Sequence, residues 1–205
     1  VEGIQGIGGI YVPDPAFLEA LQTLCSKYGS LLILDEIQSG YGRSGRFFAF
    51  QYSTVEPDIV SMAKGMGNGF PIGGILIHPR IAARKGMLGT TFGGNHLACA
   101  AGIAVLDVIE QEDLVGNAQR IGEILFTQLK SIGLFREVRG RGLMIGLQMD
   151  QVIAPLRKKL LFEQHIFAGS AANPNTLRLL PPLNIAEEHC RQLLHGLDVA
   201  IRMGR

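Results

Sequence analysis

The sequence predicts an α/β fold with a mainly parallel sheet, on three observations. The run 31–34 is apolar at every position, which is typical of a parallel strand covered on both faces. Apolar runs at 59–60 and 72–77 repeat this pattern farther along the chain. Residues with helical spacing precede the first run, as in a β-α-β unit in which a helix crosses over between parallel strands.

The first two helices are predicted from their caps and their apolar spacing. One begins at Asp14-Pro15, where an acid can cap the helix and proline suits the first turn, and it stops at Gly29. Its apolar residues at helical spacing are Phe17, Leu18, Leu21, Leu24, Cys25 and Tyr28. The second helix is predicted over 96–110; it is rich in alanine and apolar nearly all round, so we expect it to be buried.

The chain changes character near residue 113, where a smaller α+β lobe is predicted to begin. An amphipathic helix follows Asp113, with its apolar stripe at Leu114, Ala118, Ile121, Leu125 and Leu129. Further elements are expected as strands at 135–139, 143–149 and 176–180, a turn at 140–142, and helices near 154–164 and from about 186 to 203. We therefore divide the chain into two domains, 1–112 and 113–205.

Composition argues against nucleic acid and membranes as partners. The 19 Lys and Arg residues nearly balance the 18 Asp and Glu residues, and the net charge of +1 comes without a basic cluster. No apolar run approaches the roughly 20 residues of a membrane-spanning helix. The three cysteines lie far apart, and the five histidines show no metal spacing. We expect a cytoplasmic protein without a metal site.

Two strand ends carry the residues on which a functional hypothesis rests. Lys64 follows an apolar strand and opens a glycine-dense turn, where an amine can hold a carbonyl cofactor as a Schiff base. Asp35 ends the run 31–34 in the same way, and a carboxylate there can stabilise a protonated ring nitrogen. Each residue alone also fits an ordinary end-cap or loop position. Together they resemble the two poles of a pyridoxal phosphate (PLP) site at the carboxyl edge of the sheet.

A third motif, Gly89-Thr90-Thr91-Phe92-Gly93-Gly94-Asn95, completes the pattern. With Asp35-Glu-Ile-Gln and Ala63-Lys64-Gly65 in this order, the chain resembles the class III, ornithine-type aminotransferases, and the acetylornithine and succinylornithine branch most of all. The resemblance covers essentially all 205 residues. It implies a fold-type I PLP-dependent transferase, with 1–112 in the large PLP-binding domain and 113–205 as the small C-terminal domain. Because family members are longer, we expect the sequence to be about the second half of such a protein.

The resemblance implies cofactor contacts for four residues. Lys64 would bind the aldehyde carbon of PLP and later move a proton as general acid and base, and Asp35 would face the ring nitrogen. Gln38 would bond the phenolic oxygen of the ring, and Ile37 would pack on one ring face. An ordinary core position is an equally good interpretation of Ile37.

Three further residues are implied to bind the phosphate or the substrate. Thr91 would reach the phosphate of the neighbouring subunit, so that a homodimer shares its active sites, and Thr90 would lie toward the substrate. A plain helix N-cap is the alternative for Thr91. Arg178 would clamp a substrate carboxylate with two hydrogen bonds, as opposed to pointing into solvent from its strand.

The function that the resemblance implies is transamination of N-acetylornithine or N-succinylornithine with 2-oxoglutarate in arginine biosynthesis. The alternatives are ornithine or 4-aminobutyrate aminotransferase, an aminomutase, or a catalytically silent fragment that serves as a dimerisation module. One departure from the family pattern stands out, because Ile7 occupies a position where the family has a glutamate. The 205 residues on their own are expected to be inactive, since the family's first half supplies the other phosphate loop and the group that stacks on the ring.

Overall fold

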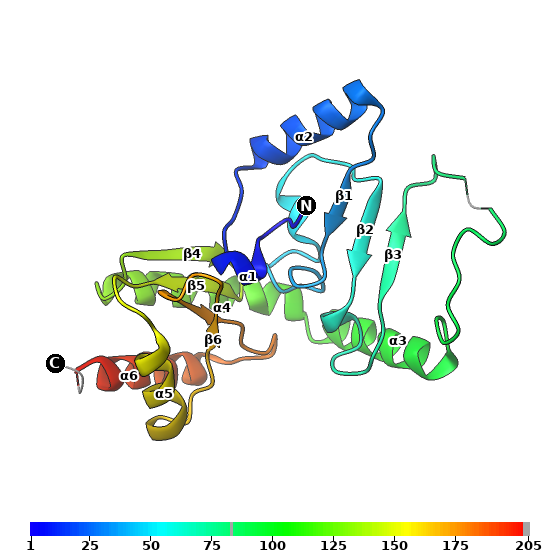
Figure 1. Cartoon of the computed structure of the whole chain (residues 1–205). Helices are drawn as coiled ribbons and strands as arrows, with labels where there is room; N and C mark the ends of the chain where they lie inside the picture. Colours follow the sequence, from blue (N-terminus) through cyan, green and yellow to red (C-terminus); the bar gives the residue numbers. More distant parts are fainter. Residues whose placement is uncertain (83, 203–205) are drawn as a thin grey trace.

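The computed structural model describes residues 1–82 and 84–202 and contains two sheets (Figure 1). The first sheet has the order β1 (Ile33–Asp35), β2 (Ile59–Met62), β3 (Gly74–Ile77). Strands β1 and β2 are parallel, with Asp35 opposite Ser61. Strand β3 runs antiparallel to β2, so the parallel strand expected over 72–77 is wrong. A parallel return needs a long crossover, usually a helix, whereas 63–73 contains only the single 3-10 turn η2 (Lys64–Met66).

Helix α2 (Pro15–Tyr28) confirms the first predicted helix and its caps. Asp14 accepts a hydrogen bond from the amide of Ala16, and Gly29 ends the helix in the left-handed region. Buried residues of α2, of β1 and the residue before it, and of the loop before β2 form one small core, made of Leu18, Leu32, Leu34 and Val55. The other face of β1 is open, with Ile33 46 % exposed, so the expectation that both faces are covered is wrong for this strand.

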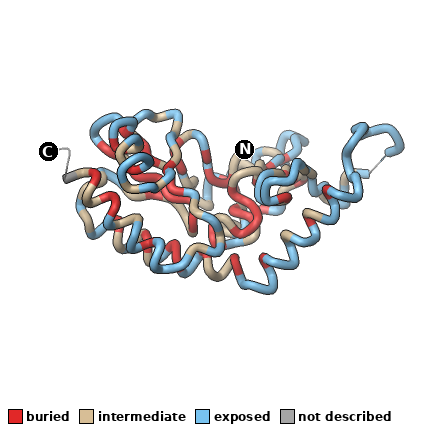
Figure 2. Tube along the Cα trace, turned by 90° about the horizontal axis from the view of Figure 1, so that it is seen from below, coloured by how far each residue is buried: buried red, intermediate tan, exposed pale blue. Residues whose placement is uncertain are grey.

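Helix α3 (His96–Gln111) lies where it was predicted but is mostly exposed. Its buried residues are Ala98, Gly102 and Ile109. Leu97 and Ile103 are 73 % and 60 % exposed, because within the described residues only one side of the helix packs against the chain. Figure 2 shows this exposed helix leading to the long loop at the edge of the molecule. The expected burial of this helix is therefore wrong.

The C-terminal part contains the predicted helices and strands, but Gly140 and Arg141, expected in a turn, belong to a strand and pair with Ile145 and Met144. Its helices are α4 (Leu114–Ser131), α5 (Ala154–Glu163) and α6 (Glu187–Arg202), and its strands are β4 (Glu137–Arg141), β5 (Met144–Gln148), β6 (Gly169–Ser170) and β7 (Thr176–Leu179). The antiparallel sheet has the order β4-β5-β7-β6, and the short β6 was not predicted. The five apolar residues of the α4 stripe are all buried: Leu114 packs with Val60, Met62 and Ile109, and the other four lie in the main core.

The N-terminal segment is largely irregular. It makes one parallel bridge, from Glu2 to Asp35, and then forms the helical turn α1 (Gly6–Gly9). Arg139 of β4 ties this turn to the second sheet: its Nε donates to the carbonyl of Gly9 at 2.8 Å, and its guanidinium lies 4.2 Å from the ring centre of Tyr11. The second short helical turn of this region is η1 (Ala49–Tyr52).

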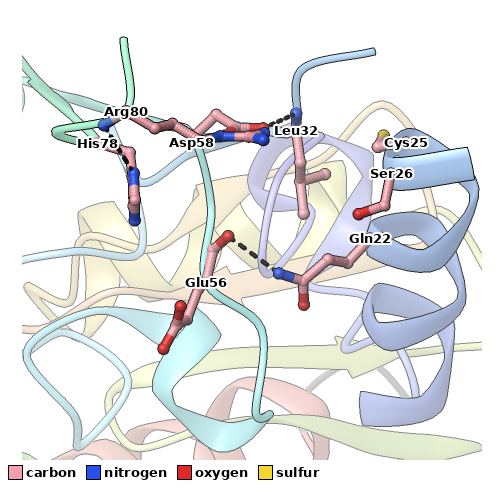
Figure 3. Close-up of a pocket in the computed structure, with 8 residues that line it drawn as sticks. All are labelled: Gln22, Cys25, Ser26, Leu32, Glu56, Asp58, His78 and Arg80. Carbon is pink, nitrogen blue, oxygen red and sulfur yellow. Dashed lines mark hydrogen bonds and ion pairs between the residues drawn. The ribbon is translucent and has the colours of Figure 1, made fainter. Parts of the chain in front are cut away.

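A small hollow of about 200 Å³ lies at the amino edge of the parallel strands (Figure 3). Asp58 is 5 % exposed there and accepts hydrogen bonds from the amide of Leu32 and from the guanidinium of Arg80. These contacts join the start of β1, the start of β2 and the residues after β3. The hollow is thus a junction of the three strands. Among the described residues, no helix is long and apolar enough to cross a membrane.

Candidate active site

The two strand-end residues lie at the same edge of the first sheet. Asp35 is the last residue of β1, and Lys64 comes two residues after β2 ends. Because β1 and β2 are hydrogen-bonded parallel neighbours, the carboxylate and the amine are brought to adjacent positions beyond their carboxyl ends. Both residues therefore lie at the carboxyl edge of the sheet, and their roles toward a cofactor stay predictions.

Lys64 is exposed and adopts a backbone conformation that residues other than glycine rarely adopt. Its φ is 46°, in the left-handed region, which costs a residue other than glycine about 1–2 kcal/mol. The following Gly65 packs tightly, since a Cβ there would lie 3.1 Å from the Cβ of Tyr41. A strained residue beside a close backbone approach is typical of functional sites.

An open cleft of about 600 Å³ lies beside this edge. Three of the predicted residues, Ile37, Gln38 and Lys64, line it together. Its apolar walls come from α3, from the first residue of α4 and from the segment after β7, with Val105, Val108, Ile109, Leu114, Leu180 and Leu183. Asp35 is half-buried next to the cleft but does not line it. A mostly apolar hollow with a few polar groups is the usual form of a small-molecule site.

Asp35 and Gln38 are held by a compact turn after β1. The Oδ1 of Asp35 accepts a hydrogen bond of 2.9 Å from the amide of Ile37. The base of the turn is Glu36, which is fully buried and accepts hydrogen bonds from Ser39 and from the amides of Ala49 and Phe50. Burial raises the pKa of Glu36 because it disfavours the charged form.

Arg178 lies in β7 between two glycines of the neighbouring strands, Gly146 and Gly169. It is half-buried, and its Nε donates to the carbonyl of Ser170, whereas Nη1 is buried without a hydrogen-bond partner among the residues that the structure describes. Desolvation, with the nearby charge of Arg157, lowers the pKa of this guanidinium. A buried donor without a partner is costly, and a carboxylate would satisfy it. Arg178 is not among the residues that line the cleft.

Thr90 and Thr91 are not brought to the cleft. Both are exposed in the segment between β3 and α3, which extends away from the sheet (Figure 1). Thr90 accepts a hydrogen bond from the amide of Gly93 at 3.1 Å. The N-cap of α3 is Asn95, whose side chain accepts from the amide of Ala98. The alternative that made Thr91 a plain N-cap is therefore wrong.

The cleft also contains polar residues that sequence reasoning missed, namely Tyr41, Arg43, Asn68, Glu112 and Asn184. Arg43 is half-buried, and desolvation lowers its pKa. It follows Gly40 and Gly42 in the turn after β1. This run of glycines, so similar to the one after Lys64, is the signal that could have pointed to it.

A family model described as aminotransferase class-III matches residues 1–201 of the chain. The chain belongs to the class-III aminotransferases. The resemblance inferred from the three motifs is thereby confirmed, as is the α/β, fold-type I architecture, which the solved relatives of this class-III chain share.

Relatives of this class-III chain are found among both sequences and structures. Acetylornithine aminotransferase 1 of Bordetella pertussis is 42 % identical over 98 % of the chain and 52 % of its own length. The crystal structure of acetylornithine aminotransferase from Elizabethkingia anophelis has a TM-score of 0.90 and 33 % identity over 99 % of the chain and 53 % of its own. A structure of ornithine aminotransferase from Toxoplasma gondii, with partial occupancy of PLP at its active site, has a TM-score of 0.88 and 32 % identity over 98 % of the chain and 50 % of its own. The chain thus spans about half the length of these relatives.

Proposed function

We propose that this chain is part of a PLP-dependent aminotransferase that moves the amino group of N-acetylornithine or N-succinylornithine to 2-oxoglutarate. The observation that carries the proposal is the placement of Asp35 and Lys64 at the ends of adjacent parallel strands. The name of the Bordetella pertussis relative supports the acyl-ornithine substrate, and the PLP in the Toxoplasma gondii relative supports the cofactor.

The chemistry of the donor set fits PLP. Lys64 offers a primary amine for an aldehyde, Asp35 offers a half-buried carboxylate for a protonated ring nitrogen, and Gln38 offers an amide for a phenolic oxygen. Ile37 lines the same cleft with an apolar side chain that suits a ring face. When bound, the cofactor supplies an electron sink for the carbon that bears the substrate's amino group.

The residues of the chain have distinct tasks in this proposal. The free amine of Lys64 would first act as general base and take the proton from the substrate carbon. It would then act as general acid and give a proton back. The Asp35 carboxylate keeps the facing ring nitrogen protonated, because an opposite charge in a poorly solvated site stabilises the cation. The partnerless Nη1 of Arg178 is the donor that would bind a substrate carboxylate.

The homodimer, the cellular location and the division into domains are also proposals. Thr91 is exposed and does not line the cleft of its own chain, which agrees with a phosphate contact in the partner subunit of a homodimer, and Thr90 would then face that partner's substrate. We place the enzyme in the cytoplasm and in arginine biosynthesis. We also keep the division into a large-domain part, 1–112, and a small domain, 113–205, since the second sheet and the main core are built from 118–201.

Borohydride reduction of the full-length enzyme tests the proposal. The visible absorbance band is expected to bleach, and peptide mapping should find the cofactor attached to Lys64. Attachment at Lys85 or Lys130 would contradict the assignment. Turnover of acetyl-, succinyl- and free ornithine, compared on the same preparation, then identifies the donor; a preference for free ornithine would favour the ornithine aminotransferase alternative.

A further inference from the structure

We propose that Arg43 is a positioning residue that holds Arg178 at its working distance from Lys64. The inference rests on the proposed function, because it concerns how the carboxylate of a substrate is gripped. It adds to that function a residue that lies outside the three motifs.

Arg43 is joined to the second sheet on both sides. Its Nη1 donates a hydrogen bond to the carbonyl of Pro181, and its own carbonyl accepts one of 3.0 Å from the amide of Leu143. Leu143 comes directly before β5, and Pro181 comes two residues after β7. These two strands are hydrogen-bonded neighbours, so one residue is anchored to adjacent strands.

Pro181 lies three residues from Arg178, and the connection between them is stiff. Arg178 sits inside β7, paired with Gly146 on one side and Gly169 on the other. The ring of Pro181 fixes its own φ angle and restricts the backbone of Leu180 before it. A displacement of the Pro181 carbonyl would therefore displace Arg178 by nearly the same amount.

Arg43 is linked to Lys64 through the turn after β1. The amide of Arg43 bonds the carbonyl of Gly40, and the amide of Gly40 bonds the carbonyl of the buried Glu36. Tyr41, in the same turn, packs against Gly65. The turn that carries Arg43 is thus fixed to the residue after Lys64, and Arg43 links this fixed point to the strand of Arg178.

The consequence concerns the geometry of substrate binding. A substrate held at Lys64 by its amino end and at Arg178 by a carboxylate needs the two groups at a set separation, and small errors in such positioning are costly. The position of the bound carboxylate would be set by Arg43 without any contact between Arg43 and the substrate.

A calorimetric measurement on the full-length enzyme, loaded with cofactor, tests this role. Glutarate, an unreactive dicarboxylate, serves as the probe, so the readout does not depend on turnover. Arg43→Met should raise the Kd of glutarate about tenfold, or ~1.4 kcal/mol, because Arg178 is no longer held in place. Arg46→Met is the matched control: Arg46 is exposed in the same loop, and its loss should leave the Kd unchanged.

A double-mutant comparison separates positioning from a general structural effect. In an Arg178→Met background, Arg43→Met should change the Kd of glutarate less than about twofold, because there is nothing left to position. Equal effects in both backgrounds, or no effect in the parent, would overturn the inference while the proposed function stands. A parent enzyme that neither binds glutarate nor transaminates 2-oxoglutarate would overturn both. If Arg43→Met does not fold, Arg43→Lys replaces it, with a smaller rise expected because the charge remains.

Discussion

Individual residues of this chain show how close packing around glycines can arrange a site. Arg178 and Gly146 are directly opposite in antiparallel strands, so their side-chain positions share one face of the sheet. A Cβ on Gly146 would lie 2.7 Å from the carbonyl of Gly9, which places α1 on that same face. The carbonyl of Ile7 also accepts a hydrogen bond from Ala172, in the loop between β6 and β7. Ile7, which is 54 % exposed, therefore belongs to the surroundings of Arg178.

Replacing Ile7 by glutamate should weaken the binding of 2-oxoglutarate to the full-length enzyme. A carboxylate at this position would compete for the guanidinium of Arg178, and each ~1.4 kcal/mol of competition lowers the affinity tenfold. Titration of the cofactor-loaded Ile7→Glu variant with 2-oxoglutarate measures the effect. Ile7→Gln, equally long but uncharged, is the control and should bind nearly as well as the parent. Unchanged affinity in a folded Ile7→Glu variant would show that residue 7 does not face Arg178.

Single elements are held by polar contacts that lie far from the cleft. The junction at Asp58 joins all three strands of the first sheet at the edge opposite Lys64. Burial acts to raise the pKa of Asp58, but hydrogen bonds from Leu32 and Arg80 outweigh it, so this pKa lies below its ordinary value of 3.8. The carboxylate form is thus the one that stabilises the sheet.

Asp58→Asn is expected to lower the free energy of unfolding of the full-length enzyme by about 1–3 kcal/mol at neutral pH, since an amide cannot accept from both donors. Because the folded pKa is depressed, this stabilisation is present above pH 3.8 and is lost as the pH falls through the folded pKa. Urea unfolding of parent and variant at several pH values should show the difference shrinking in acid. Glu56→Gln, an exposed position at the same hollow, is the control. A difference that persists at the lowest pH would contradict the assignment to the carboxylate.

The elements that could be predicted from the sequence are those whose signals are local. The caps at Asp14 and Gly29 predict both ends of α2, and the apolar stripe after Asp113 predicts the start of α4 and its buried face. The direction of β3 and the exposure of α3 depend on which other elements pack nearby, which no local pattern records. The same distinction applies to the cleft. Lys64 can be predicted from a motif. The contact from Arg43 to Pro181 cannot, because no sequence pattern links these two residues.

Across the whole molecule, apolar surface is distributed unevenly. The main core around α4, β5 and β7 is one continuous apolar cluster, while large apolar side chains stay exposed on α3 and β3, among them Leu97, Ile103, Ile75 and Leu76. Exposed apolar surface that gathers on neighbouring elements favours association, because its burial releases water. These elements are expected to govern how the 205 residues behave on their own.

The chain of 205 residues, expressed alone, should self-associate and fail to retain PLP. Leu97→Glu combined with Ile103→Glu is expected to raise the monomeric fraction, because charges on α3 oppose the burial of that surface. Size-exclusion chromatography with light scattering measures it. Thr127→Glu with Gln119→Glu, two changes on the exposed side of α4, form the control and should have less effect. A monomeric parent chain that binds PLP stoichiometrically would contradict the prediction.

The ties between early and late parts of the chain also determine when the site can form during synthesis. Arg139 bonds the carbonyl of a residue 130 positions earlier, and Arg43 bonds one 138 positions later. Contacts of such separation close large loops and form late in folding. Asp35 and Lys64 leave the ribosome well before Pro181. The first sheet is therefore synthesised before it can make the contacts of Arg43 and Arg139 with the rest of the chain. A ribosome that stalls before residue 181 therefore releases a polypeptide that carries both reactive side chains but has no complete site. We expect chaperones to bind such a product or proteases to degrade it.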